Sequence, residues 1–287
     1  MISRSELIRK TKEILRDYAL QPNKNLGQNF CVEPAILDLI TAQLEIIQPN
    51  AILEVGGGLG TLSEKIISMN KHLTIVEKDS NLAVLLEQKF SSKNVKVLNM
   101  DILQFDNEKL QEFEVIIGNI PYEISSPLLF KIWSNKPKKG HSPHILLTIQ
   151  KEFALRLAAK PRTQDYGRLS AMTQLFTIPN VLKIYPPSAF YPVPKVAHGV
   201  IHLVPITNIS DLAFTTEFAT FMIALFNRKN KKVINSLEPI IKKQRSDTLE
   251  SELRKHELFL KRVRDVEPLE CIKLFEIWTE LKKENKN

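Results

Sequence analysis

The sequence has no apolar run of the roughly 18 residues that a membrane-spanning helix needs. It also lacks a signal-peptide core, because residues 1–18 alternate charged and aliphatic side chains. These two absences exclude the classes of protein that are built around a membrane span. We therefore expect a soluble, cytoplasmic protein that does not associate with a membrane.

Cysteine is scarce as well. The only two, Cys31 and Cys271, lie near opposite ends of the 287 residues and form no Cys-x-x-Cys pair. This spacing supports neither a disulfide framework nor a structural zinc site. We expect no metal.

Acidic residues are outnumbered by basic ones. The chain has 40 Lys and Arg against 32 Asp and Glu, for a net charge of +8. With 43% hydrophobic and 25% charged residues, the composition is otherwise that of an ordinary globular protein. The excess of positive charge favours a polyanionic partner without identifying one.

Short apolar runs alternate with helical stretches in the first two thirds of the chain. The predicted strands are 51–55, 73–77, 95–98, 114–117, 144–149 and 199–204. Such alternation is typical of an α/β fold with a mostly parallel sheet and helices on both faces. Beyond Pro205 the apolar residues recur only at helical spacing. We predict a catalytic domain over residues 1–205 and a small all-helical domain over 206–287.

A glycine-rich turn, 54–60, joins the first predicted strand to the next helix. Its glycines let a ligand lie close to the backbone. The dinucleotide fingerprint G-x-G-x-x-G requires glycine at position 61, which is threonine here. The turn therefore favours a ligand without phosphates, although a purely structural turn stays open as an alternative.

Acidic residues end the next two strands. Glu77 follows the turn at close to the spacing at which a carboxylate meets ribose hydroxyls, and Asp101 follows the third strand, where it is placed to accept from an adenine amino group. Each alone is equally well explained as a solvated strand end or a helix cap. Together with Gly56 they predict a nucleoside site, for which S-adenosylmethionine is the common ligand.

The fourth strand ends in the motif Asn119-Ile120-Pro121-Tyr122 at the same predicted edge. The Asn119 side chain and the Ile120 carbonyl are acceptors suited to an exocyclic amine, and Pro121 restricts the turn that carries them. Tyr122 and Phe190 are candidates for stacking on a base, which contributes roughly 1–3 kcal/mol. The alternative for both rings is ordinary packing in the core.

In combination these motifs resemble the ribosomal RNA adenine N6,N6-dimethyltransferases, in particular the kasugamycin-resistance family that acts on the small subunit. The resemblance rests on five ordered segments, which are 26–30, 54–60, 119–128, 165–170 and 190–196. It implies a Rossmann-like, class I S-adenosylmethionine-dependent methyltransferase domain with a seven-stranded sheet. The implied reaction is transfer of two methyl groups to N6 of each of two adjacent adenosines in the 3′-terminal hairpin loop of 16S rRNA.

The resemblance also implies roles for individual residues. Its cofactor contacts fall on Asn29, Cys31, Gly56, Glu77, Asp101 and Asn119, and its target-base contacts fall on Asn119, Ile120, Pro121, Tyr122 and Phe190. Cys31 departs from the family's usual leucine. Ala197-His198 departs from the usual polar residue followed by serine, which places fine substrate preference in question.

The densest basic cluster lies in the predicted helical domain and comprises Arg228, Lys229, Lys231 and Lys232. It resembles the family's basic segment and is expected to contact rRNA phosphates. The implied partner is small-subunit rRNA in a pre-30S particle, bound by a monomer.

Three other functions stay open. The large-subunit 23S rRNA dimethyltransferases of macrolide resistance share the Asn-Ile-Pro-Tyr form, but Gly27, the step Ser126-Pro127 and the motif at 165–168 count against them. A non-catalytic ribosome-assembly or transcription factor on the same fold is disfavoured by the intact cofactor residues. A DNA adenine methyltransferase more typically has two prolines before the aromatic residue, where Ile120 intervenes here.

Overall fold

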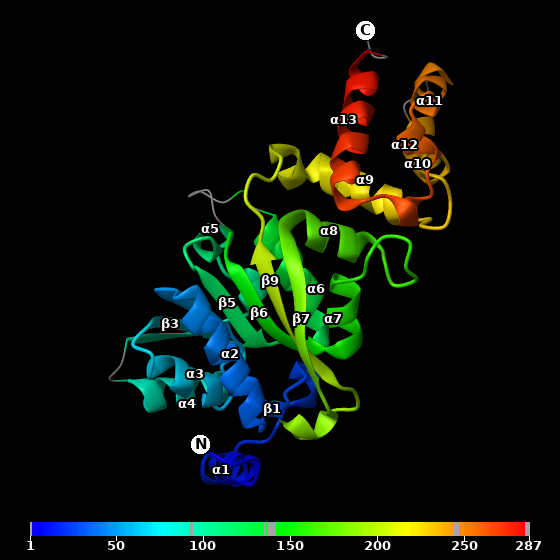
Figure 1. Ribbon diagram of the computed structural model, residues 1–287. Helices are drawn as coiled ribbons and strands as arrows, with labels where there is room; N and C mark the ends of the chain where they lie inside the picture. The colour runs from blue at the N-terminus through cyan, green and yellow to red at the C-terminus, as the bar shows by residue number, and fades with distance from the viewer. Residues whose placement is uncertain (1, 92–93, 135, 137–141, 244–246, 285–287) are drawn as a thin grey trace. The chain divides into compact units, whose positions relative to one another are not determined.

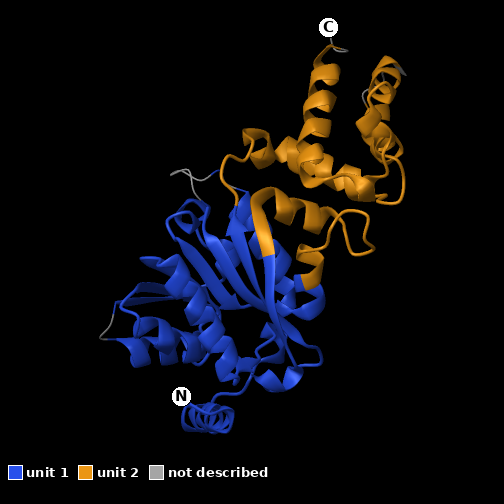
Figure 2. Cartoon of the chain, viewed as in Figure 1, with its two compact units in different colours: residues 1–154, 180–205 blue, residues 155–179, 206–287 orange. Residues whose placement is uncertain are grey.

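The computed structural model describes residues 2–91, 94–134, 136, 142–243 and 247–284 (Figure 1). The chain forms two compact units, the first of Met1–Ala154 with Asn180–Pro205 and the second of Leu155–Pro179 with Ile206–Asn287 (Figure 2). The second unit thus takes in a segment that the predicted division places before residue 206. The functional division into 1–205 and 206–287 stays a prediction.

A seven-stranded sheet has the order β4-β3-β2-β5-β6-β9-β7. Its strands are β2 (Ala51–Val55), β3 (His72–Glu77), β4 (Val95–Asn99), β5 (Val115–Asn119), β6 (His144–Gln150), β7 (Thr177–Tyr185) and β9 (His198–Pro205). The five strands from β4 to β6 are parallel, and β9 is antiparallel to β6. The mostly parallel sheet predicted from the apolar runs is confirmed.

The helices of the first unit are α1 (Arg4–Asp17), α2 (Pro34–Ile47), α3 (Thr61–Ile67), α4 (Ser80–Phe90), α5 (Asn107–Leu110), α6 (Tyr122–Trp133) and the start of α7 (Lys151–Leu157). Two of them begin at residues that typically start a helix. Pro34 occupies the first turn of α2, and the Asp79 side chain caps α4 by accepting from the Asn81 and Leu82 amides. Short 3₁₀ turns lie at Lys24–Leu26, Ile102–Gln104 and Pro187–Ala189.

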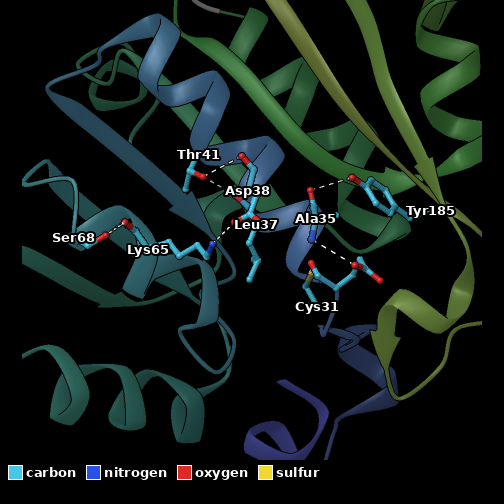
Figure 3. Close-up of polar contacts among 9 residues, drawn as sticks. Cys31, Ala35, Leu37, Asp38, Thr41, Lys65, Ser68 and Tyr185 are labelled. Atoms are coloured by element: carbon cyan, nitrogen blue, oxygen red, sulfur yellow. Dashed lines mark hydrogen bonds and ion pairs between the residues drawn. The ribbon is translucent and has the colours of Figure 1, made fainter. Parts of the chain in front are cut away.

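Side-chain bonds tie α2 to its neighbours (Figure 3). The Tyr185 hydroxyl at the end of β7 donates to the Ala35 carbonyl at 3.1 Å. Asp38 forms an ion pair with Lys65 of α3. Apolar residues of α2, among them Ile36 and Ile40, are buried in the main core. These bonds and contacts hold α2 in a fixed position beside the sheet.

The first unit also contains a two-stranded ribbon that the sequence pattern did not predict. In it β1 (Phe30–Cys31) pairs antiparallel with β8 (Phe190–Tyr191), so that Cys31 lies opposite Phe190. Strands of two residues have no periodicity, and their pairing joins segments far apart in the sequence. Strand β7 was likewise predicted only as extended chain, because Pro179 interrupts its pattern.

The second unit is mostly helical where it is described; its other paired residues are the start of β7, which it shares with the first unit, and one isolated bridge between Lys232 and Arg262. It contains α8 (Arg168–Phe176), α9 (Thr216–Phe226), α10 (Val233–Lys242), α11 (Asp247–Arg254), α12 (Glu257–Leu260) and α13 (Pro268–Glu284), with 3₁₀ turns at Asp211–Phe214 and Val263–Asp265. Aromatic contacts hold α9 to α13, with Phe275 5.3 Å from both Phe218 and Phe221. No helix of the described residues is long and apolar enough to cross a membrane.

Candidate active site

A pocket of about 190 Å³ lies where the parallel strands of the first unit end. Its walls come from the glycine-rich turn after β2, the ends of β3 and β5, the residues after β4, and the segment 25–31. All six predicted cofactor residues line it, namely Asn29, Cys31, Gly56, Glu77, Asp101 and Asn119. The placement agrees with the rule that open α/β sheets bind ligands at the carboxyl ends of their strands.

The glycine-rich turn leaves room for a ligand. Gly56 has φ of +75°, and a Cβ built there would meet no atom within 4 Å, so the backbone is open to the pocket at this point. Two residues on, the Gly58 amide donates to Glu77 Oε2 at 3.0 Å. The turn is thus fixed to the neighbouring strand through the carboxylate that it faces.

Glu77 is only 6% exposed, yet both carboxylate oxygens have partners. Oε2 accepts from Gly58, and Oε1 accepts from the Asp79 amide at 2.9 Å. Burial raises the pKa of Glu77, and these hydrogen bonds oppose the rise. Each oxygen keeps a further lone pair, so the side chain is held in place with acceptor capacity for ligand hydroxyls.

Glu54, the first residue of the glycine-rich motif, is a second buried carboxyl in the pocket wall. Its Oε2 accepts from the Ser63 hydroxyl at 2.6 Å. Burial raises the pKa of Glu54 to about 8, against the hydrogen bond from Ser63 and with a contribution from Glu77. The side chain is therefore mainly neutral at pH 7.

This burial predicts a pH-dependent effect on stability. A carboxyl whose pKa is higher in the folded than in the unfolded chain stabilises the fold less as pH rises, here between about 4.5 and 8. Glu54→Gln removes that dependence and keeps an acceptor for Ser63. The variant is expected to gain about 2–4 kcal/mol relative to the natural chain between pH 5 and pH 8. Urea unfolding at both pH values measures it, and an equal difference at both would contradict a neutral Glu54.

Asp101 follows β4 and also lines the pocket, and both its carboxylate oxygens have partners. Oδ1 accepts from the Leu103 amide at 2.9 Å, and Oδ2 lies 2.8 Å from Lys78 Nζ. The hydrogen bond from Lys78 lowers the pKa of Asp101. The carboxylate stays ionised, and its role as an acceptor for a ligand amino group stays a prediction.

The segment 25–31 is tied to the strand ends at two points. The Asn119 side-chain amide donates to the Asn29 carbonyl at 2.6 Å, and the Gln28 amide donates to Asp79 at 2.8 Å. Cys31 donates weakly to the Glu33 carbonyl, and burial raises the pKa of its thiol to about 12. Cys31 is thus a neutral wall residue, which agrees with a backbone or packing role and not with thiolate chemistry.

The Asn119 turn joins the same pocket. Asn119, Ile120 and Pro121 all line it. The Ile120 amide donates to the Thr148 carbonyl of β6 at 3.0 Å, and the Pro121 carbonyl accepts from Ser125 at 2.8 Å. Because the Asn119 amide nitrogen is directed to Asn29, its oxygen is the end left to accept from a ligand.

The two predicted stacking rings differ in environment, and neither lines this pocket in the part of the chain that is described. Tyr122 begins α6, is 55% exposed, and meets Phe153 edge-on with ring centres 6.2 Å apart. Phe190 is 1% exposed and packs against the His198 ring at 4.5 Å. Tyr122 is exposed enough to meet a base, whereas stacking by Phe190 requires its ring to be uncovered; both roles stay predictions.

The predicted RNA-binding cluster lies between α9 and α10. Lys231 and Lys232 are exposed, Arg228 lies 3.9 Å from Glu238, and Lys229 donates to the Gln164 carbonyl at 2.7 Å. A second basic segment, Lys261–Arg264, joins it through backbone bonds, since the Val263 amide donates to the Lys231 carbonyl. The role of the cluster stays a prediction.

Sequence reasoning missed several residues of the site. Lys78, Gln28 and Ser63 each bond to an acidic side chain in or beside the pocket. For Lys78 a signal existed, because it directly follows Glu77 at the edge where the ligand is expected. Among the described residues, no group of three or more His, Cys, Asp or Glu side chains is arranged to hold a metal ion.

Comparison with known proteins gives consistent matches. The family "Ribosomal RNA adenine dimethylase" matches residues 19–278. The chain is 35% identical over 239 residues to ribosomal RNA small subunit methyltransferase A of Alkaliphilus oremlandii, covering 80% of this chain and 82% of that protein. It is 30% identical to the probable ribosomal RNA small subunit methyltransferase A of Methanothermobacter thermautotrophicus, covering 95% and 96%. Among solved structures, a dimethyladenosine transferase from Plasmodium falciparum superposes with a TM-score of 0.71 at 25% identity, covering 88% of this chain and 98% of that one.

Proposed function

This chain belongs to the ribosomal RNA adenine dimethylase family, and we propose that it methylates N6 of two adjacent adenosines in the 3′-terminal hairpin loop of 16S rRNA. It is a small-subunit rRNA adenine dimethyltransferase on a Rossmann-like class I methyltransferase fold. The names of its relatives favour this function over the large-subunit alternative. The observation that carries the proposal is one pocket lined by Gly56, Glu77 and Asp101 together with the Asn119 turn.

The residues present fit S-adenosylmethionine as the methyl donor. Gly56 leaves open space beside the backbone, Glu77 offers a fixed carboxylate to ribose hydroxyls, and Asp101 offers one to the adenine amine. Asn29, Cys31 and Asn119 complete the wall. When bound, this cofactor supplies an electrophilic methyl group.

The chain's own residues position the target amine. The N6 lone pair of adenine is delocalised into the ring, so acceptors for its two protons favour a nitrogen that is more pyramidal and more nucleophilic. The Asn119 side-chain oxygen and the Ile120 carbonyl are those acceptors, and Tyr122 stacks on the base. No strong base is needed, because the amine proton becomes acidic once the nitrogen is alkylated. Catalysis then comes mainly from positioning and preorganised dipoles.

The partner is small-subunit rRNA in a pre-30S particle, which the basic cluster at Arg228–Lys232 contacts through phosphates. We propose that the protein acts as a cytoplasmic monomer. The net charge of +8 supports a polyanionic substrate.

A labelling experiment tests the assignment. The protein is incubated with S-adenosylmethionine carrying a labelled methyl group and with undermethylated small or large ribosomal subunits, and N6,N6-dimethyladenosine is mapped. We expect label at two adjacent adenosines of the small subunit only. Label in the large subunit would select the macrolide-resistance function, and no label in either would favour a non-catalytic assembly factor.

A further inference from the structure

The ion pair between Lys78 and Asp101 occupies the acceptor that the proposed function assigns to adenine. Lys78 Nζ lies 2.8 Å from Asp101 Oδ2, and both residues line the pocket. The other oxygen, Oδ1, accepts from the Leu103 amide. An incoming amine therefore meets a carboxylate on which each oxygen already has a donor.

The backbone holds the pair together. Glu77 ends β3 and Lys78 follows it directly, and the Asn99 side-chain amide at the end of β4 donates to the Glu77 carbonyl at 3.0 Å. The Met100 amide donates to the same carbonyl at 3.1 Å. Lys78 and Asp101 thus project from two strand ends that are fixed to each other, so their proximity is built into the sheet edge.

Each Asp101 oxygen keeps a further lone pair, so an amine can bind beside Lys78, but two donors on one carboxylate share its negative charge and each weakens the other's hydrogen bond. A lysine ammonium is charged, and its hydrogen bond to a carboxylate is stronger than that of a neutral aromatic amine. We propose that Lys78 sets the affinity of the cofactor site, because it competes with the adenine amino group for Asp101 and so weakens the binding of every adenosine ligand. The proposal rests on the proposed function, in which Asp101 receives adenine.

The competition is modest in size. The Lys78 side chain is 57% exposed and that of Asp101 is 20% exposed, so solvent screens the pair. Exposed ion pairs contribute little, and release of Lys78 is expected to strengthen adenosine binding by about three- to fivefold at low salt.

The test compares Lys78→Met with the natural chain by calorimetry, using S-adenosylhomocysteine, adenosine and purine riboside. Purine riboside has the same sugar and ring system but no exocyclic amine. Lys96→Met is the control, because Lys96 is an exposed lysine on the neighbouring strand β4 that does not line the pocket. Thermal melting checks that each variant is folded.

We expect Lys78→Met to bind S-adenosylhomocysteine and adenosine about three- to fivefold more tightly at low salt, with the gain vanishing as salt is raised. Its affinity for purine riboside should be unchanged, and Lys96→Met should match the natural chain throughout. Equal changes for adenosine and purine riboside, or weaker adenosine binding, would overturn the role of Lys78. If the natural chain binds neither adenosine nor S-adenosylhomocysteine, the cofactor site itself is wrong and the proposed function fails with it.

Discussion

Asn119→Ala is expected to lose methyl transfer by about 10²–10³-fold, while its affinity for S-adenosylhomocysteine stays within about tenfold of the natural chain. The reason is that the side-chain oxygen acts on the target amine, where the demand for an acceptor is greatest in the transition state. The amide nitrogen, which donates to the Asn29 carbonyl at 2.6 Å, accounts for the smaller loss in cofactor affinity.

Single-turnover methylation of undermethylated small subunits measures the first effect, and calorimetry measures the second. Asn81→Ala is a matched control, because Asn81 is exposed in the first turn of α4 and does not line the pocket. Near-natural turnover of Asn119→Ala would contradict the assignment. A loss of cofactor affinity as large as the loss of rate would make Asn119 a support for the segment 25–31 alone.

The second large effect concerns rRNA binding by the cluster Arg228, Lys229, Lys231 and Lys232. Replacing all four with glutamine is expected to weaken binding to pre-30S particles by about tenfold or more. The slope of log affinity against log salt concentration should become shallower by roughly 0.7–0.9 for each phosphate that the variant no longer neutralises. The physical reason is that each cation that contacts a phosphate releases a bound counterion. A salt titration of affinity for the particle measures both quantities.

The structure allows a cleaner version of this test. Lys229 donates to the backbone carbonyls of Gln164 and Tyr166, so its removal also loosens a loop. Lys231 and Lys232 are exposed, and their replacement changes charge with less effect on packing. Lys242→Gln with Lys243→Gln is the matched pair at the end of α10. Equal salt slopes for the two double variants would show that rRNA binds through another face.

The strands of the parallel sheet were predictable because each is a short apolar run bounded by a turn or by polar residues. Strands β2, β3 and β6 were predicted to within one residue at each end. Strand β7 was not predicted, because Pro179 and the neighbouring Asn180 interrupt its apolar run. An edge strand tolerates such an interruption. The spacing of apolar residues was therefore enough to predict the parallel strands. The edge strand β7 was not predictable in this way, because it depends on tertiary contacts.

The residues of the site likewise divide into those that the sequence predicts and those that depend on tertiary contacts. Glu77 and Asp101 were placed correctly at the pocket because they follow neighbouring parallel strands, and together with the glycine-rich turn they indicate the edge where open α/β sheets bind ligands. The partner of Asp101 was missed, because a lone lysine is usually a solvated side chain. The burial of Phe190, which the sequence analysis kept open as an alternative, could not be decided from the sequence, because the ring that packs against it comes from His198 at the start of β9.

The Asn119 amide has two ends with different duties. Its nitrogen donates to the Asn29 carbonyl in the segment 25–31, and its oxygen is the acceptor that the proposed function assigns to the target base. We expect a movement of the segment 25–31 on cofactor binding to turn the Asn119 side-chain oxygen as well. Coupling between two binding sites is reciprocal, so a base that binds to this oxygen changes the affinity for the methyl donor by the same factor. Through this one amide we therefore expect the binding of the methyl donor and of the target base to be coupled.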